Sequence, residues 1–216
     1  MTENTQNSFL ALPPSGKGPG ILVLHAWWGL NDYVKEFCRR LAEAGYVALA
    51  PDLFQGKIAA TVVEAEQLVS TADNQRIAAD LFAAAERLRS LPGVTGEALG
   101  VIGFSFGAYW ALWLSAQPSA AIRAVTVFYG TGHDEFAQSQ AAYLGHFAES
   151  DPFEPAASVA ELEEMLRRAN RPVTFHTYAG TGHWFFESDR PEAYQPQAAR
   201  LAWERTLAFL KEQFPV

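Results

Sequence analysis

The sequence predicts an α/β fold built on a mostly parallel sheet of about seven or eight strands, with helices on both faces. Short runs rich in Val, Ile and Leu alternate with longer amphipathic stretches, which is the pattern of β–α–β units. Most of these runs are apolar at successive positions, as expected of strands that are covered on both sides. The 216 residues are 49% apolar and show no internal repeat or linker, so we expect a single domain over residues 1–216.

Seven apolar runs are the predicted strands. A segment rich in Pro and Gly, residues 13–18, follows the first run and is expected to be a turn that joins an edge strand to the rest of the sheet. In chain order the predicted strands are Ser8–Leu12, Gly20–His25, Tyr46–Ala50, Leu99–Gly103, Arg123–Tyr129, Ala142–Phe147 and Val173–Tyr178.

Amphipathic segments between these strands are the predicted helices. The first begins after a candidate N-cap, Asn31, and ends at Gly45. Its apolar stripe consists of Val34, Phe37, Cys38 and Leu41. Two segments then form either one broken helix or two successive helices, and three more helices come later. In order these segments are Ala60–Ala72, Asn74–Ser90, Phe106–Ala116, Val159–Ala169 and Pro191–Phe214.

Composition excludes several classes of protein. There are 16 basic and 24 acidic residues, with no block of Lys and Arg, so binding to nucleic acid or to an anionic membrane is not expected. The first residues lack the regions of a signal peptide, and no run approaches 18 apolar residues, so we expect a cytoplasmic protein, a monomer or a homodimer. The single cysteine, Cys38, excludes an internal disulfide and a Cys-rich metal cluster, and neither metal nor cofactor is expected.

A short motif marks a candidate nucleophile. Gly103-Phe104-Ser105-Phe106-Gly107 is a G-x-S-x-G sequence between a predicted strand and a predicted helix. A serine on such a turn stands clear of the sheet, and the flanking glycines are needed because the turn leaves no room for side chains. The alternative is a plain helix start with Ser105 as its N-cap. We favour the nucleophile because partners for it follow later in the chain.

A serine hydroxyl needs a histidine base and a carboxylate that orients the histidine. On folds built around this motif they follow in the order serine, acid, histidine. Asp151, after the sixth predicted strand, and His183, after the seventh, satisfy that order. Taken singly, Asp151 could cap a turn and His183 could be a surface residue of a Gly-rich turn. Asp134 and Glu135 are the competing candidates for the acid, and we favour Asp151.

The other histidines have structural interpretations. His146 and His176 fall inside predicted strands, and His133 lies in a loop without an obvious partner. His25 ends the second predicted strand, where we expect it to bind the loop that follows.

Five spaced segments resemble the dienelactone hydrolase family of α/β-hydrolases over nearly the whole chain, from about Leu10 to Leu210. The resemblance implies an α/β-hydrolase fold with Ser105 as nucleophile, Asp151 as acid and His183 as base. It also implies that the backbone N–H groups of Trp27 and Phe106 form the oxyanion hole. The segments that carry it are His25–Asn31, Ala48–Phe54, Gly103–Gly107, His146–Pro152 and Gly182–Phe185.

Two departures from the family's type members bear on mechanism and substrate. Type members carry Cys at the nucleophile position and Glu just after the strand that here ends in His25. This chain has Ser105 and Ala26 instead, so a conventional Ser-His-Asp cycle is expected. Type members also bind a substrate carboxylate with arginines, one of them shortly after the histidine. Here that segment is Trp184-Phe185-Phe186-Glu187, and the resemblance does not extend to this arginine.

Aromatic residues crowd the motif loops and indicate an apolar pocket. Only about 20 residues separate Gly130 from Asp151, which leaves no room there for a large cap domain. The expected activity is hydrolysis of small, mostly apolar esters or lactones through an acyl-enzyme. A thioesterase or acyltransferase using the same triad, or a protein that binds a ligand without turnover, are the alternatives. The expected substrate contacts are Trp28, Tyr129, Phe153 and Trp184.

Overall fold

The computed structural model of the chain describes residues 2–5, 8–132 and 135–215. Its strands are β1 (Thr2–Thr5), β2 (Ser8–Ala11), β3 (Gly20–Leu24), β4 (Val47–Pro51), β5 (Leu99–Phe104), β6 (Ile122–Phe128), β7 (Ala142–Ser150) and β8 (Val173–Gly182). They form one sheet in the order β1-β2-β4-β3-β5-β6-β7-β8. The pairs β1–β2 and β2–β4 are antiparallel, and all other neighbouring pairs are parallel. The predicted mostly parallel α/β architecture is thus confirmed.

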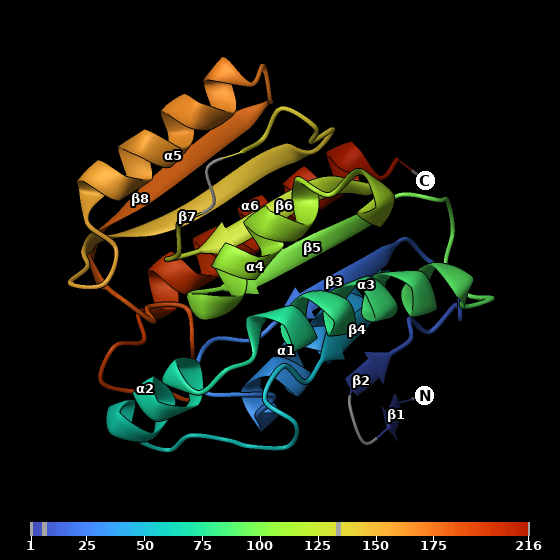
Figure 1. The fold of residues 1–216 in the computed structure, drawn as a ribbon, viewed down its shortest axis with the longest axis horizontal. Helices are drawn as coiled ribbons and strands as arrows, with labels where there is room; N and C mark the ends of the chain where they lie inside the picture. Colours follow the sequence, from blue (N-terminus) through green and yellow to red (C-terminus); the bar gives the residue numbers. More distant parts are fainter. Residues whose placement is uncertain (1, 6–7, 133–134, 216) are drawn as a thin grey trace.

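Helices cover both faces of this sheet (Figure 1). They are α1 (Asp32–Glu43), α2 (Val62–Ser70), α3 (Asn74–Ser90), α4 (Phe106–Ser115), α5 (Ala156–Arg168) and α6 (Pro196–Gln213), with a short 3₁₀ helix at Pro118–Ala120. The apolar residues of α3, α4 and α5 belong to the core on one face, and those of α1 and α6 to the core on the other. The carboxyl ends of the parallel strands therefore meet at one edge between two helical layers, where ligand sites of such sheets lie.

All seven predicted strands are present, but two features of the sheet differ from the prediction. Ser8–Ala11 is not an edge strand, because the polar segment Thr2–Thr5 pairs with its outer side. That segment has no apolar pattern, so nothing in its composition indicates a strand. β7 and β8 also extend three or four residues beyond their apolar runs, to Ser150 and Gly182, since their pairing continues through polar positions. Asp151 and His183 consequently follow immediately on two neighbouring strand ends.

The helices agree with the prediction except near some of their starts. Asn31 caps α1, because its side chain accepts a hydrogen bond from the Val34 N–H. α2 and α3 are separate helices, and Asp73 caps the second through the N–H groups of Gln75 and Arg76.

The predicted helix Pro191–Phe214 was wrong at its start, because α6 begins only at Pro196. The preceding residues form turns, in which the N–H groups of Ala193 and Tyr194 donate to the Arg190 carbonyl. Gln195 then donates to the Phe185 carbonyl, which ties the segment to the loop that follows His183. α5 begins three residues before its predicted start, directly after Pro155. Proline suits the entrance of a helix because the first N–H groups have no partner within the helix.

The turn between β5 and α4 brings backbone segments into close approach. Ser105 is its single residue, with φ +48° and ψ −113°. A Cβ atom on Gly103 would lie 2.3 Å from the carbonyl oxygen of Gly107, and one on Gly107 would lie 2.3 Å from that of Leu24. Both glycines are required because the first turn of α4 lies directly against β5 and against the end of β3.

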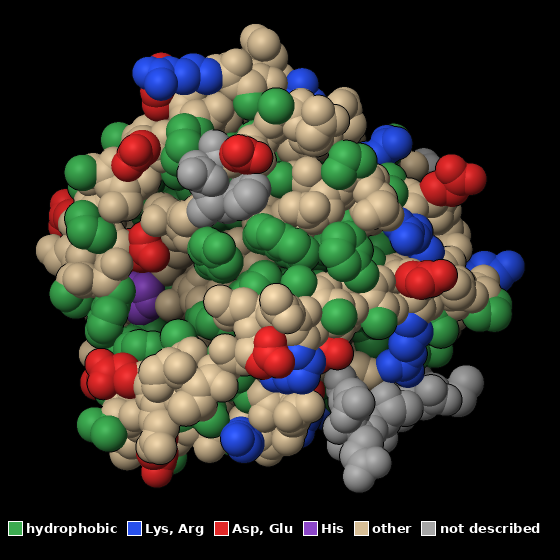
Figure 2. All heavy atoms as spheres, in the orientation of Figure 1, with side chains coloured by type: hydrophobic (Ala, Val, Ile, Leu, Met, Phe, Trp, Pro, Cys, Tyr) green, Lys and Arg blue, Asp and Glu red, His purple; other side chains and the backbone are tan. Residues whose placement is uncertain are grey.

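Two further features concern the apolar content of the helices and the distribution of charged side chains. Within the described residues, no helix has the length and apolar content needed to cross a membrane. On the face shown in Figure 2, Lys and Arg side chains are scattered among Asp and Glu side chains and form no basic patch.

Gly107→Ala tests the close approach at this turn. The added methyl group would meet the backbone of β3, which cannot yield easily, so we expect a loss of about 3 kcal/mol or more in the free energy of unfolding. Gly96→Ala is the control, because its Cβ would meet no atom within 4 Å and only its φ of +79° is unfavourable. That variant should lose about 1 kcal/mol in urea titrations. Equal losses would contradict the explanation.

Candidate active site

Ser105 lies where the carboxyl ends of the central strands meet the start of α4. Its left-handed backbone conformation is one that a serine adopts at a cost of about 1–3 kcal/mol. The surrounding backbone holds it there, because the Ser105 N–H donates to the Phe128 carbonyl at 2.9 Å, while the Ser105 carbonyl accepts from the Ala108 N–H at 2.8 Å. The residue is partly exposed at this edge of the sheet.

His183 connects Ser105 to Asp151. Its Nδ1 lies 2.7 Å from Asp151 Oδ2, and its Nε2 lies 2.9 Å from Ser105 Oγ. A carboxylate only accepts, so Nδ1 carries a proton and Nε2 is free to accept one from the serine hydroxyl. The side chains of His183 and Asp151 are 3% and 2% exposed. The three residues named from the sequence are therefore brought into one hydrogen-bonded chain.

The second carboxylate oxygen of Asp151 is occupied by the backbone. Oδ1 accepts from the N–H groups of Phe153 at 2.9 Å and Glu154 at 3.1 Å. These bonds fix the carboxylate plane and leave Oδ2 aimed at His183. Of the competing acids, Asp134 lies outside the described residues, as does His133, and it is Asp151 rather than Glu135 that bonds to His183.

Two backbone N–H groups near the strand ends have no hydrogen-bond partner in the described part of the chain. Phe106 is the first residue of α4, and Trp27 lies in the loop after β3. Both are thus available to donate to a ligand oxygen.

His25 fixes the loop that carries Trp27. Its Nδ1 donates to the Ala26 carbonyl at 2.7 Å, and its Nε2 accepts from the Leu53 N–H at 3.1 Å. Burial lowers the pKa of this histidine, which keeps it neutral. In a trans peptide the carbonyl and the following N–H point in opposite directions. Holding the Ala26 carbonyl therefore also aims the Trp27 N–H away from His25, as expected for a structural histidine at this place.

Three aromatic rings gather around His183. Trp27 and Trp184 each lie 5.4 Å from Phe153 between ring centroids, and Phe153 lies 5.0 Å from the imidazole. Phe153 is 45% exposed, and the two tryptophans are partly exposed. These three side chains, Trp27, Phe153 and Trp184, form an apolar wall at the mouth of the site.

Two of the expected substrate contacts lie behind this wall. Trp28 is 3% exposed, and its ring packs against the rings of Trp27 and Trp184. Tyr129, another expected substrate contact, has no exposed surface in the structure. Its hydroxyl instead donates to Glu187 Oε1 at 2.7 Å, and its ring lies 4.9 Å from that of His183.

Glu187 is the residue near the site whose position the sequence did not reveal. It lies four residues after His183 and is 2% exposed. Burial raises its pKa to about 8, opposed by the Tyr129 hydrogen bond and by Arg190. A further carboxyl, Glu154, accepts from the Thr131 hydroxyl at 2.6 Å, and partial burial raises its pKa. For Glu187, the sequence offered one signal of burial, namely an acidic residue directly after the three aromatic residues 184–186.

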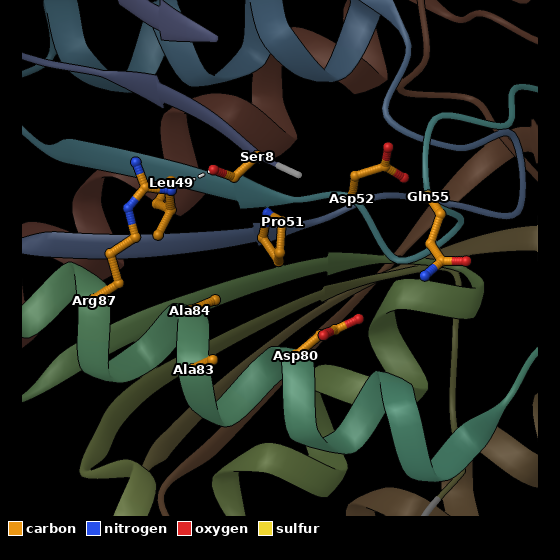
Figure 3. Close-up of a pocket in the computed structure, with 9 residues that line it drawn as sticks. All are labelled: Ser8, Leu49, Pro51, Asp52, Gln55, Asp80, Ala83, Ala84 and Arg87. Atoms are coloured by element: carbon orange, nitrogen blue, oxygen red, sulfur yellow. Dashed lines mark hydrogen bonds between the residues drawn. The ribbon is translucent and has the colours of Figure 1, made fainter. Parts of the chain in front are cut away.

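A separate hollow of about 210 Å³ lies between α3 and the strands β2 and β4 (Figure 3). Its charged groups bond within the protein. Arg87 extends from α3 to the Ser8 hydroxyl, Asp80 pairs with Arg76, and Asp52 accepts from the N–H groups of Phe54 and Gly56. None of its lining residues belongs to the hydrogen-bonded chain of Ser105.

Comparisons with known proteins place the chain among hydrolases. Residues 7–214 match the model of the "Dienelactone hydrolase family". A relative from Bradyrhizobium named "Probable 2-oxo-3-(5-oxofuran-2-ylidene)propanoate lactonase" is 32% identical, over 94% of this chain and 88% of its own length. A "Putative carboxymethylenebutenolidase" from Methylorubrum extorquens is 30% identical, over 95% and 76%. The crystal structure of a "Putative Dienelactone Hydrolase" from Klebsiella pneumoniae superposes with a TM-score of 0.81 at 25% identity, covering 94% of this chain and 91% of that one.

Glu187→Gln should make the protein progressively more stable than the wild type as pH rises. With a pKa of about 8 in the folded state against an ordinary 4.5, Glu187 takes up a proton on folding between these two pH values. The contribution of Glu187 to the free energy of unfolding is full below pH 4.5. Between pH 4.5 and pH 8 it falls by about 1.4 kcal/mol per pH unit. Glutamine has the same shape and does not ionise. Urea unfolding at pH 5, 6.5 and 8 measures the difference, and a difference independent of pH would contradict the buried proton.

Proposed function

This chain belongs to the dienelactone hydrolase family and hydrolyses ester or lactone bonds, and from that premise we propose that it is a serine hydrolase with Ser105 as nucleophile. The observation that carries the proposal is the continuous chain of hydrogen bonds from Asp151 through His183 to Ser105, at 2.7 and 2.9 Å. The strained turn at Ser105 and the free N–H groups beside it support the same assignment.

In the first half of the cycle, Ser105 Oγ attacks the substrate carbonyl carbon while His183 Nε2 takes the hydroxyl proton. The carbonyl oxygen becomes an anion, which the N–H groups of Phe106 and Trp27 stabilise. Collapse of this intermediate breaks the bond to the leaving oxygen, which receives the proton from His183. The product is an acyl-enzyme on Ser105, and in a lactone the released alcohol stays attached to it.

Water completes the cycle. His183 takes a proton from a water molecule, whose oxygen attacks the acyl carbon. The second intermediate returns the proton to Ser105 Oγ and releases the acid. Asp151 accepts from Nδ1 and so holds the imidazole in the required tautomer, while its bonds to the Phe153 and Glu154 amides fix the orientation of the carboxylate.

The chemistry around Ser105 favours a small, mostly apolar and uncharged acyl group. Trp27, Phe153 and Trp184 offer ring faces at the mouth of the site. Asp151 and Glu154 place carboxyl groups near His183, which opposes a substrate carboxylate. The nearby cation, Arg190, lies over the Trp28 ring at 3.7 Å instead of facing Ser105. The lactonase named among the relatives makes small lactones natural first substrates to test.

The proposal includes a single domain that acts in the cytoplasm as a monomer or a homodimer on a small-molecule substrate. Light scattering coupled to gel filtration distinguishes the two assembly states.

Ser105→Ala should lower kcat on an aryl ester by roughly a millionfold, as removal of a triad nucleophile does. The wild type should also be labelled by a fluorophosphonate at Ser105. Turnover by the alanine variant above about a thousandth of the wild-type rate would refute the assignment. Labelling with one burst of product and no turnover would instead indicate a ligand-binding protein.

Phe153→Ala should raise KM for a phenyl-substituted acyl group by roughly fivefold to tenfold, because a ring that is 45% exposed beside His183 is lost. KM for an acetyl ester should change much less. Leu201→Ala is the control, since Leu201 is also exposed, at 39%, but lies on α6. An equal effect on both esters would argue that Phe153 does not contact the acyl group.

A further inference from the structure

Glu187 is a buried carboxyl group that the catalytic cycle does not use. It is 2% exposed and lies on the loop that follows His183. Burial of a carboxyl group without full pairing is costly, so its presence among aromatic side chains calls for a compensating contact. That contact comes from Tyr129, whose hydroxyl donates to Oε1 at 2.7 Å.

The groups around Glu187 come from three parts of the chain. Tyr129 follows β6, and Tyr33 belongs to α1. Asp189 and Arg190 lie on the same loop as Glu187 and influence its ionisation in opposite directions. No ion pair joins Glu187 to a cation among the described residues. The bond to Tyr129 is therefore its direct link to the rest of the site.

The loop after His183 is fastened at further points. The Tyr33 hydroxyl donates to the Phe186 carbonyl at 3.1 Å, and Asn31 Nδ2 donates to Asp189 Oδ2 at 3.0 Å. Both of these bonds connect the loop to the start of α1. Among the side-chain hydrogen bonds of the described residues, the bond between Tyr129 and Glu187 is the one that connects the loop to the end of β6, whose Phe128 carbonyl also binds the Ser105 N–H.

Tyr129 contacts both Glu187 and His183. Its backbone is held at φ +36°, and its N–H donates to the His146 carbonyl at 2.8 Å, so the ring leaves the strand end in a fixed direction. The ring then lies 4.9 Å from the imidazole of His183, and Phe153 lies 5.0 Å from it. Hydrogen bonds thus hold both nitrogens of the imidazole, while two rings lie beside it, tilted by 57° and 55°.

We propose that Glu187 and Tyr129 are a pair of positioning residues for the base. The carboxyl of Glu187 accepts from the Tyr129 hydroxyl and so orients the Tyr129 ring beside His183. The same bond connects the loop after His183 to the end of β6. The imidazole then stays between Asp151 and Ser105 without the freedom to turn. This inference rests on the proposed function, because it requires His183 to act as the base for Ser105.

Kinetics of three variants test the pair on an aryl ester. Tyr129→Phe removes the donor, Glu187→Met removes the acceptor at similar volume, and the double variant removes both. Each single variant should lower kcat about tenfold with KM nearly unchanged, because substrate contacts remain. The double variant should lose no more than either single one, since all three break the same link. Glu187→Gln keeps an oxygen that accepts from Tyr129, and it should restore most of kcat.

Thr206→Val is the control for a general loss of stability. Thr206 is a buried residue of α6, and its hydroxyl accepts from His146 Nε2 at 3.0 Å. It should lower the midpoint of thermal unfolding and leave kcat at the wild-type level. If kcat falls in proportion to stability in all of these variants, Thr206→Val included, then Glu187 and Tyr129 are merely structural.

The two proposals fail in different ways. If Ser105→Ala keeps its turnover, the serine mechanism itself is wrong. If the wild type depends on Ser105 but Tyr129→Phe and Glu187→Met match its kcat, only the positioning role is wrong. Additive losses in the double variant would also overturn it, because the two residues would then act separately.

Discussion

The close approach of α4 to the ends of β3 and β5 is the constraint on which the rest of the site depends. Because Gly103 and Gly107 have no side chains, the first turn of α4 lies against the Leu24 carbonyl and Ser105 is forced into a left-handed conformation. That single turn leaves Ser105 partly exposed and places Phe106 at the start of α4, against the end of β3. His25 fixes the loop that carries Trp27 by holding the Ala26 carbonyl. Asp151 and His183 then reach Ser105 from the ends of β7 and β8.

Local chemistry explains which parts of this arrangement could be predicted from the sequence. The G-x-S-x-G motif, the N-cap Asn31 and the apolar strands are local patterns, and each lies where it was expected. The order of Ser105, Asp151 and His183 along the chain was sufficient to name a set that the fold then brings within hydrogen-bonding distance. The strand Thr2–Thr5 was missed because pairing with β2, not its own composition, makes it a strand.

Burial was the other property that the sequence did not reveal. Tyr129 and Phe153 are both aromatic residues in loops near the site, yet one has no exposed surface and the other is 45% exposed. The difference arises from the loop after His183, which covers Tyr129 and supplies Glu187 as its partner. A carboxylic acid within an aromatic segment is usually assigned to the surface. Here it lies inside, because the tyrosine hydroxyl satisfies one of its oxygens.

The position of β8 at the edge of the sheet has a consequence for how activity is lost. β8 pairs with one strand, β7, and many of its side chains are exposed, so its hydrogen bonds are less protected than those of the central strands. His183 is the first residue after this strand, whereas Ser105 follows β5 in the middle of the sheet. Fraying of β8 would separate the imidazole from the serine while the core stays folded. Heat or denaturant would then inactivate the protein before its global unfolding, and the inactivation would be reversed as soon as one strand re-formed.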